Sequence, residues 1–284
     1  MTSQPRRIDA HQHFWDPSRG GYRWLAANPD EINRRFDFDD LAPHLESRGV
    51  HGTVLVQADD TDADTDAMFE VAATHPEIRG VVAYVPLERP EVAAERLTAL
   101  QPRERFVGVR NLIHDQPDPD WLLRPDVAEG LRLLEQAGVS FDLVTSRLRH
   151  LEHVTYLSER FPDLRLVVDH LGKPPVKTEQ LQPWATLIRQ AAANPLAYAK
   201  VSGLYPARGD WRDHRPDDLR PWIDVAVDAF GPGRLMIGSD WPVNELAGGY
   251  DVVWPNLEQV LDSYGADVRD PILGQNAIDY YGLS

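Results

Sequence analysis

Residues 8–13 read IDAHQH, a short apolar run that ends in two histidines separated by one residue. A run of this length suits a β-strand, in which successive side chains point to opposite faces. His11 and His13 therefore share one face, and Gln12 lies on the other. Two imidazoles that point the same way can hold one cation. The segment thus predicts both the first strand of the fold and a place for its chemistry.

Seven more short apolar runs follow, and longer amphipathic segments separate them. Val and Ile are frequent in these runs, as expected for parallel strands that are covered by crossover helices. The predicted strands are residues 7–13, 52–57, 80–86, 106–112, 140–144, 164–170, 197–202 and 234–240. The predicted helices are residues 39–48, 64–75, 90–100, 126–137, 148–161, 182–193, 217–230 and 253–264.

Eight strands that alternate with eight helices predict an α/β fold, a single closed (β/α)8 barrel of the TIM type spanning residues 1–284. No internal repeat or Ser/Gly-rich linker divides the sequence. Gly49, Gly138 and Gly231 follow predicted helices, where left-handed caps would end them. An open doubly wound sheet is the alternative, but no G-x-G-x-x-G motif follows the first strand.

Two irregular segments, at about residues 14–38 and 204–216, follow predicted strands and are rich in aromatic, Gly and Pro residues. Loops after the strands of such a barrel surround its mouth, where ligands bind. We therefore expect both segments to act as loops of the active-site mouth.

Composition narrows the class of protein. The chain has no cysteine, which excludes disulfides and thiolate chemistry and fits the cytoplasm. Residues 1–7 lack the apolar segment of a secretory signal, and no apolar run is long enough to span a bilayer. A net charge of −16 argues against a nucleic-acid partner. We expect a soluble cytoplasmic protein that binds a small molecule and neither membrane nor nucleic acid; monomer and homodimer both stay open.

Polar residues at the carboxyl ends of barrel strands converge on one mouth. The sixth predicted strand ends in His170 and the eighth in Asp240, so these two side chains should join His11 and His13. Three imidazoles and one carboxylate suit a single divalent cation, with Zn²⁺ the first candidate. A carboxylate in this position can also move protons during hydrolysis.

Six segments, taken in order, resemble the amidohydrolase superfamily in its branch of sugar and pyrone-dicarboxylate lactonases. They are IDAHQHFWDP, VLVQA, GVRNLI, VVDHLGKP, KVSGL and IGSDWPV, and the resemblance covers nearly the whole chain. It implies a hydrolase that opens a sugar-acid lactone, such as L-fucono- or L-rhamnono-lactone, by attack of water on the carbonyl. It also implies that Asp240 handles the proton and that His170 orients or polarises.

The chain departs from the fuller superfamily pattern at its fourth strand. A binuclear site would have a bridging Lys or Glu there, whereas this sequence has Arg110. A guanidinium repels a second cation and binds carboxylate or carbonyl oxygen, so we expect at most one metal ion. Catalysis without metal stays an alternative, because lactones are more electrophilic than amides and positive side chains can stabilise the oxyanion.

Five residues near the predicted mouth are candidates for substrate contacts. Arg110 and Lys173 could bind substrate oxygens, and the Gln57 amide could bind hydroxyls or instead a neighbouring Gln or His. Trp24 and Trp241 could offer flat apolar surfaces to a sugar ring, or could simply pack the loops.

Lys200, near the end of the seventh strand, has a role that the sequence leaves open between structure and catalysis. If it faces the barrel interior, it needs a carboxylate partner, for which Asp142 and Asp169 are the candidates.

Three other functions are weighed against the sugar lactonase. A pyrone-dicarboxylate or muconolactone hydrolase needs at least two cationic contacts, which Arg110 and Lys173 could supply. A metal-dependent decarboxylase of the same superfamily needs a bound metal and a carboxylate substrate. A barrel kept only for binding would show affinity without turnover, and the intact set of strand-end residues argues against it.

Overall fold

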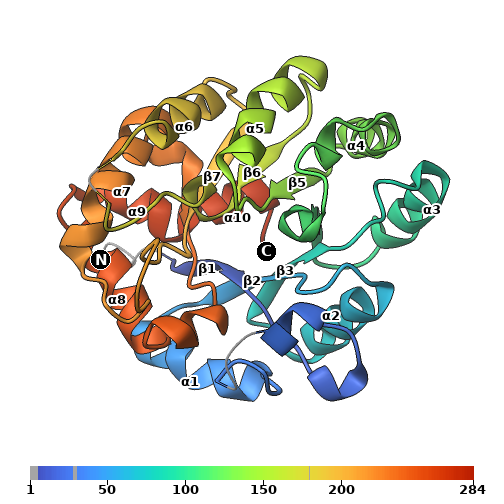
Figure 1. Ribbon diagram of the computed structural model, residues 1–284. Helices are drawn as coiled ribbons and strands as arrows, with labels where there is room; N and C mark the ends of the chain where they lie inside the picture. The colour runs from blue at the N-terminus through green and yellow to red at the C-terminus, as the bar shows by residue number, and fades with distance from the viewer. Residues whose placement is uncertain (1–5, 28–30, 179) are drawn as a thin grey trace.

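The computed structural model describes residues 6–27, 31–178 and 180–284. In these ranges eight parallel strands form one sheet in sequential order, with each strand beside the next along the chain (Figure 1). The strands are β1 (Ile8–Gln12), β2 (Gly52–Val56), β3 (Ile78–Ala83), β4 (Phe106–Asn111), β5 (Ser140–Leu143), β6 (Leu166–Val168), β7 (Ala197–Val201) and β8 (Leu235–Ile237). Seven of the predicted runs contain a whole strand, and the run at residues 80–86 overlaps β3, which begins two residues earlier.

The barrel closes through residues that follow the last strand. The Asp240 amide donates to the His11 carbonyl at 2.9 Å, and the His13 amide donates to the Trp241 carbonyl at 2.7 Å. These bonds join the end of β1 to the segment after β8, and they confirm the predicted (β/α)8 barrel. Closure therefore depends on the same short segments that carry the polar groups of the mouth.

Helices cover the outside of the barrel, one after each strand (Figure 1). Each buries an apolar stripe against the sheet, as α4 does with Val127, Leu131 and Leu134. The covering helices are α1 (Phe38–Arg48), α2 (Asp62–Thr74), α3 (Pro90–Leu100), α4 (Pro125–Ala137), α5 (Leu148–Arg160), α6 (Trp184–Ala192), α7 (Pro216–Phe230) and α8 (Tyr250–Leu261).

Two of the three predicted glycine caps are confirmed. Gly49 (φ 61°, ψ 33°) ends α1 and Gly138 (φ 65°, ψ 19°) ends α4, both in the left-handed conformation. The prediction for Gly231 was wrong, because its ψ of 170° lies outside the left-handed region. Pro232 follows it directly and begins a separate 3₁₀ turn, so the chain extends at Gly231 instead of curling back.

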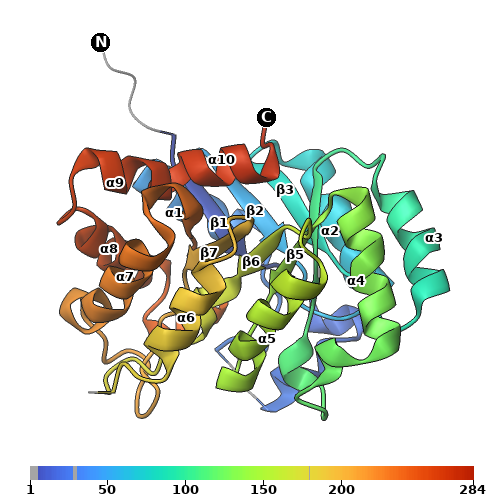
Figure 2. The ribbon, with the colours of Figure 1, turned by 90° about the horizontal axis from the view of Figure 1, so that it is seen from above.

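The last segment of the chain closes the bottom of the barrel, and the sequence did not predict it. It consists of α9 (Ala266–Asp270), a π-helical turn (Pro271–Gln275) and α10 (Asn276–Tyr281). Figure 2 shows α9 and α10 across the end of the barrel at which the strands begin. Tyr280, Tyr281 and Leu283 pack with apolar residues of the barrel interior, which places the carboxyl terminus beneath the strands.

The two predicted mouth segments lie at the other end. Residues 14–38 contain two short 3₁₀ helices (Pro17–Arg19 and Arg23–Ala27), with residues 28–30 outside the described part. Trp15 and Phe36 exchange main-chain hydrogen bonds that fasten the base of this segment.

Within the described residues no helix has both the length and the apolar character needed to cross a membrane.

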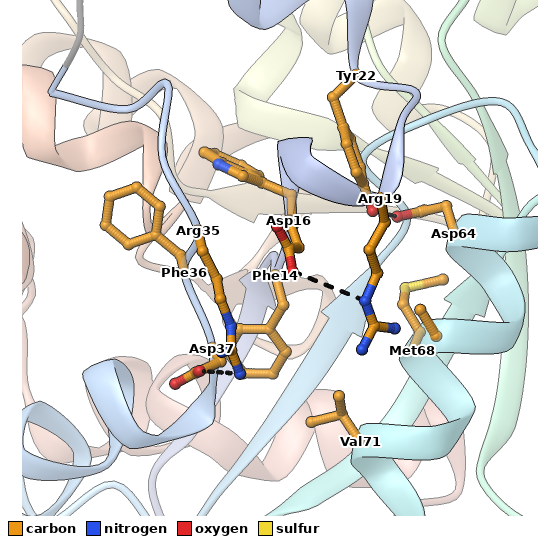
Figure 3. Close-up of a pocket in the computed structure, with 12 residues that line it drawn as sticks. Phe14, Asp16, Arg19, Tyr22, Arg35, Phe36, Asp37, Asp64, Met68 and Val71 are labelled. Carbon is orange, nitrogen blue, oxygen red and sulfur yellow. Dashed lines mark hydrogen bonds and ion pairs between the residues drawn. The ribbon is translucent and has the colours of Figure 1, made fainter.

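A small cavity shows how the first mouth segment is fixed to the barrel wall. It measures about 70 Å³ and lies between residues 14–37 and α2 (Figure 3). The Tyr22 hydroxyl donates to Asp64 of α2 at 2.7 Å, and Met68 and Val71 of that helix complete the apolar side. The first mouth segment lines one side of this space and α2 lines the other. Its geometry therefore indicates an anchor for the segment.

Candidate active site

Three imidazoles surround one carboxylate at the mouth of the barrel. The Nε2 atoms of His11, His13 and His170 lie 3.8, 3.6 and 3.8 Å from Oδ1 of Asp240. Nε2 of His11 and of His13 are 3.1 Å apart, and all four side chains are buried. The structure thus brings together the four residues that the sequence singled out as a metal-binding set, and three of them offer ligand atoms within 4.8 Å of one another.

The partners on the far side of the rings decide which nitrogens have free lone pairs. Nδ1 of His13 lies 2.7 Å from the Val56 carbonyl, which can only accept, so the proton is on Nδ1 and Nε2 is free. Nδ1 of His11 has two neighbours, Oδ1 of Asp169 at 3.3 Å and Nζ of Lys200 at 3.2 Å. An ionised Asp169 can only accept a hydrogen bond from a protonated Nδ1, whereas the Lys200 ammonium can only donate one to an unprotonated Nδ1.

The electrostatics of the set favour neutral imidazoles beside an ionised carboxylate. Burial lowers the pKa of His11 and His13, and it lowers that of His170 to about 3. Burial raises the pKa of Asp240, but His170, His13 and Lys173 together outweigh it and hold that pKa well below its usual range. Neutral imidazoles and a carboxylate are the donor types that Zn²⁺ prefers, so the residues present fit one divalent ion.

Arg110 limits how many cations this set can take. Its Nη1 atom lies 3.4 Å from Nε2 of His11 and 3.3 Å from Oδ2 of Asp169, and its Nη2 atom donates to the Gln57 carbonyl. A fixed guanidinium beside the imidazoles opposes a second metal ion there. That the site takes at most one metal ion stays a prediction.

Unusual backbone conformations gather around the same side chains. His170, Leu171, Lys173 and Asp240 have φ of 54°, 50°, 55° and 58°, in the left-handed region that non-glycine residues seldom adopt. Such strain costs on the order of 1–3 kcal/mol per residue and persists where the surroundings fix it, commonly at functional sites. These turns direct His170 and Asp240 into the mouth after very short strands.

One segment after β7 supports two members of the set. The Ser202 hydroxyl lies 2.9 Å from Nδ1 of His170. At Gly203 (φ +57°), a Cβ atom would lie 2.5 Å from Nδ1 of His170 and 3.1 Å from Oδ2 of Asp240. Two residues later, the Tyr205 hydroxyl donates to Oδ2 of Asp240 at 3.2 Å. Only glycine leaves room here for both functional side chains.

Replacement Gly203→Ala should lower kcat/KM roughly a hundredfold, because a shift of about 1 Å in a reacting group can cost that much. Gly209→Ala is the matched control: Gly209 also has positive φ (+85°), but a Cβ there meets no atom within 4 Å. Steady-state kinetics of both variants, with circular dichroism to verify folding, tests the expectation. Equal losses in both would point to backbone strain instead of displacement of His170.

A cavity of about 350 Å³ opens in front of the imidazole–carboxylate set. Its wall includes His13, His170 and Asp240 from the set, and residues of the surrounding loops. Three of the predicted substrate contacts, Trp24, Arg110 and Lys173, line it, together with His114 and Trp211. Its size lies in the range of small-molecule sites, and it places two cationic side chains beside an ionised Asp240.

The other two predicted substrate contacts lie behind this wall. Gln57 is fully buried, and its amide donates to Asp60 at 3.0 Å and to the Arg110 carbonyl at 3.1 Å. Trp241 is 1% exposed, with its ring edge-on to Phe14 at 5.7 Å. Neither is among the residues that line the cavity. The structure gives Gln57 a bracing position and Trp241 a packing position, and a substrate contact by either residue stays a prediction.

The predicted partners of Lys200 are confirmed. Its Nζ atom lies 2.6 Å from Oδ2 of Asp142 and 3.2 Å from Oδ1 of Asp169, and all three side chains are fully buried.

Sequence reasoning did not find the Tyr205 contact with Asp240. The only signal was the aromatic content of residues 204–216, and that cannot tell a hydroxyl facing a carboxylate from one facing substrate.

An eight-stranded barrel with an imidazole–carboxylate set at its mouth defines a TIM-barrel protein with a candidate active site for metal-assisted or acid–base chemistry. The chain belongs to the amidohydrolase family, whose sequence pattern matches residues 8–283. This confirms the resemblance found in the sequence.

Several known proteins are similar over nearly their full length. An L-fucono-1,5-lactonase of Burkholderia ambifaria is 36% identical, over 98% of this chain and 96% of the relative. An L-fucono-1,5-lactonase of Burkholderia multivorans is 33% identical over the same shares. The crystal structure of an amidohydrolase from Burkholderia multivorans with bound zinc has a TM-score of 0.88 and 32% identity, covering 98% of this chain and 100% of that one.

Proposed function

We propose that this protein is a lactonase that opens a sugar-acid lactone, such as L-fucono- or L-rhamnono-lactone, to its hydroxy acid. The observation that carries the proposal is the buried Asp240 carboxyl group, whose Oδ1 lies within 3.8 Å of Nε2 of three histidines at the wall of a cavity of about 350 Å³. The similarity to two L-fucono-1,5-lactonases over 98% of the chain supports the substrate class.

Asp240 would move the proton in both halves of the reaction. As the water oxygen bonds to the lactone carbonyl carbon, Asp240 takes one proton from that water. When the bond from this carbon to the ring oxygen breaks, the carboxyl proton passes to the leaving alkoxide, which becomes the hydroxyl of the product. Water and lactone are consumed one to one, and Asp240 returns to its ionised state.

Arg110 and Lys173 would stabilise the negative charge that develops on the carbonyl oxygen. Both line the cavity that Asp240 faces. Arg110 is 3% exposed and fixed by Asp169 and the Gln57 carbonyl, so little reorganisation is needed as the charge forms. Trp24 would cover the apolar face of the sugar ring from the first mouth segment.

His11, His13, His170 and Asp240 would hold one divalent ion, with Zn²⁺ the first candidate. The donor chemistry of these residues fits, and a similar amidohydrolase was crystallised with zinc. When bound, such an ion supplies Lewis acidity, which lowers the pKa of a nearby water and polarises the carbonyl.

Replacement His13→Ala should reduce the zinc content of the dialysed protein and lower turnover by at least about tenfold, because removing a ligand weakens a metal site. Elemental analysis and kinetics on the same samples would test this. His51→Ala, an exposed histidine that follows α1 at the other end of the barrel, is the control and should keep both values. Loss of zinc without loss of turnover would show that catalysis does not need the metal, and unchanged zinc content would remove His13 from the ligand set.

A pyrone-dicarboxylate or muconolactone hydrolase is the second candidate, and one observation favours it. Arg110 and Lys173 both line the cavity, and a dicarboxylate substrate needs two cationic contacts.

A proton-release assay with a pH indicator separates the candidates. The panel holds aldono-1,4- and 1,5-lactones, pyrone dicarboxylate and muconolactones, each with chelator or with added Zn²⁺ or Mn²⁺. Rapid acid release from an aldonolactone supports the proposal and measures its dependence on metal. Release from the dicarboxylate alone favours the second candidate, and silence throughout would contradict both.

A further inference from the structure

Asp60 lies on the segment between β2 and α2, and its half-buried carboxyl group takes no step in the proposed reaction. Oδ1 of Asp60 accepts from the Gln57 side-chain amide at 3.0 Å and from the Leu112 main-chain amide at 2.9 Å. Oδ2 accepts from the same Leu112 amide at 3.2 Å. Gln57 directly follows β2 and Leu112 directly follows β4. One carboxyl group therefore joins the mouth ends of two strands.

These two strands are not neighbours in the sheet, because β3 lies between them. Within the sheet they are connected only through β3, so the contacts between their ends come from side chains. The Gln57 side-chain amide donates to the Arg110 main-chain carbonyl at 3.1 Å, and Nη2 of Arg110 donates to the Gln57 main-chain carbonyl. Gln57 and Arg110 thus hold each other twice, with each side chain bonded to the main chain of the other.

The Gln57 side chain suits this place because a primary amide carries two N–H groups on one nitrogen. Nε2 donates to the Asp60 carboxyl group and to the Arg110 carbonyl, and Gln57 is fully buried. Both partners are acceptors, so turning the amide around would set its oxygen against two other oxygens. Asp60 therefore fixes the orientation of the amide that holds the main chain of Arg110.

The other contacts of the Arg110 guanidinium are weaker. Nη1 lies 3.3 Å from Oδ2 of Asp169 and 3.4 Å from Nε2 of His11, both long for a charge-assisted hydrogen bond. Nε is buried and has no hydrogen-bond partner among the described residues. The position of Gln57, which accepts from Nη2, therefore helps to set the direction of the guanidinium toward the cavity.

Both partners of the Asp60 carboxyl group are donors, and this favours its ionised form. Burial raises the pKa of Asp60 to about 7, while the Leu112 amide and the charge of Arg110 act to lower it. The neighbouring carboxyl groups of Asp59 and Glu88 raise this pKa further. Measurements at pH 8 therefore examine mainly the ionised form.

We propose that Asp60 is a positioning residue for Arg110, and that it acts through the Gln57 amide and the Leu112 main chain. With Asp60 in place, the guanidinium is held toward the cavity, where the carbonyl oxygen of a bound lactone gains negative charge. The inference rests on the proposed function for this role of Arg110. The position of the guanidinium itself can be measured without substrate.

The kinetic test compares Asp60→Asn with Asp59→Asn in the full-length protein at pH 8. Both changes remove a carboxylate from adjacent residues that line the same neighbouring cavity. Among the described residues, only the Asp60 side chain accepts from both Gln57 and Leu112. Each change is made in the wild type and in Arg110→Met, which gives a double-mutant cycle.

Asp60→Asn should lower kcat roughly tenfold with KM within about twofold, a smaller loss than the hundredfold that a misplacement of about 1 Å can cost. Arg110→Met alone should lower kcat by about 10²–10³, as for removal of one oxyanion donor. In that background Asp60→Asn should have no further effect, because its target is gone. Asp59→Asn should leave kcat unchanged in both backgrounds. A general loss of structure would act equally in both.

Nitrogen-15 NMR of protein with labelled arginine gives a second readout that needs no turnover. A guanidinium held at both Nη atoms rotates slowly about its C–N bonds and should give separate Nη signals. The Arg110 signals are assigned through their absence in Arg110→Met. They should merge or broaden in Asp60→Asn and stay separate in Asp59→Asn.

Equal losses of kcat from Asp60→Asn in the two backgrounds would overturn the proposal, and so would Arg110 signals that stay separate in Asp60→Asn. If the wild type opens no lactone in the panel, the proposed function fails, but the NMR signals still decide whether Asp60 positions Arg110. If the wild type turns over normally and neither readout responds to Asp60→Asn, only the inference fails.

Discussion

Replacing Asp240 with Asn should lower kcat for lactone hydrolysis by about a thousandfold while the barrel stays folded, since proton transfer by a positioned group contributes roughly 10²–10⁴. The amide keeps the shape of the side chain and can still accept from Tyr205, but it cannot take a proton from water. KM should change much less than kcat, because the loss falls on the transition state.

Glu245→Gln is the matched control for Asp240→Asn. Glu245 follows Asp240 on the same loop, is half-buried and lies outside the cavity wall, so the same chemical change there should leave kcat within about twofold, as for most substitutions away from special features. Zinc content is measured on all samples, because Asp240 is also a candidate ligand. Near-normal turnover of Asp240→Asn with normal zinc content would remove Asp240 from the mechanism.

The parts of the fold that the sequence predicted are those governed by simple periodicity. Each strand is a short apolar run, and each covering helix is long enough to show an amphipathic stripe. The segment after α8 was not predicted because α9, the π-helical turn and α10 have only 5, 5 and 6 residues. Elements of one or two turns carry too few residues for a period to be visible.

In the candidate site, too, the residues on regular strands could be predicted and those on irregular segments could not. Alternation along a strand fixes the direction of His11 and His13, so their convergence could be predicted. Gln57 and Trp241 come just after their strands, where the backbone turns and alternation no longer applies. Whether such a residue faces the cavity depends on loop conformation, and the structure places both behind the wall.

The contacts of Tyr205 and Tyr281 depend entirely on tertiary structure. The Tyr281 hydroxyl donates to Oδ2 of Asp142 at 2.8 Å across 139 residues of chain, and no local pattern connects the two. The need of Lys200 for a carboxylate partner was predictable, because a buried ammonium must be paired. The third member of that contact, a hydroxyl from the C-terminal helix, required the structure.

Lys200→Met should destabilise the protein by about 3–5 kcal/mol, the usual cost of removing one partner of a buried ion pair. Asp142, Asp169, Lys200 and Arg110 form a buried group of two anions and two cations. Without Lys200, Asp169 keeps the Arg110 guanidinium, whereas Asp142 retains only the Tyr281 hydroxyl. Urea denaturation monitored by tryptophan fluorescence measures the loss.

Lys177→Met provides a control in an exposed ion pair. Lys177 lies 2.6 Å from Asp213, the same separation as Lys200 from Asp142, but both members of this pair are solvent-accessible. Exposed pairs contribute about 0–1 kcal/mol, so this variant should be nearly as stable as the wild type. The double variant Lys200→Met with Asp142→Leu restores the charge balance and should regain part of the lost stability. Equal effects of the two lysine replacements would mean that the buried Lys200–Asp142 pair contributes no more to stability than an exposed pair does.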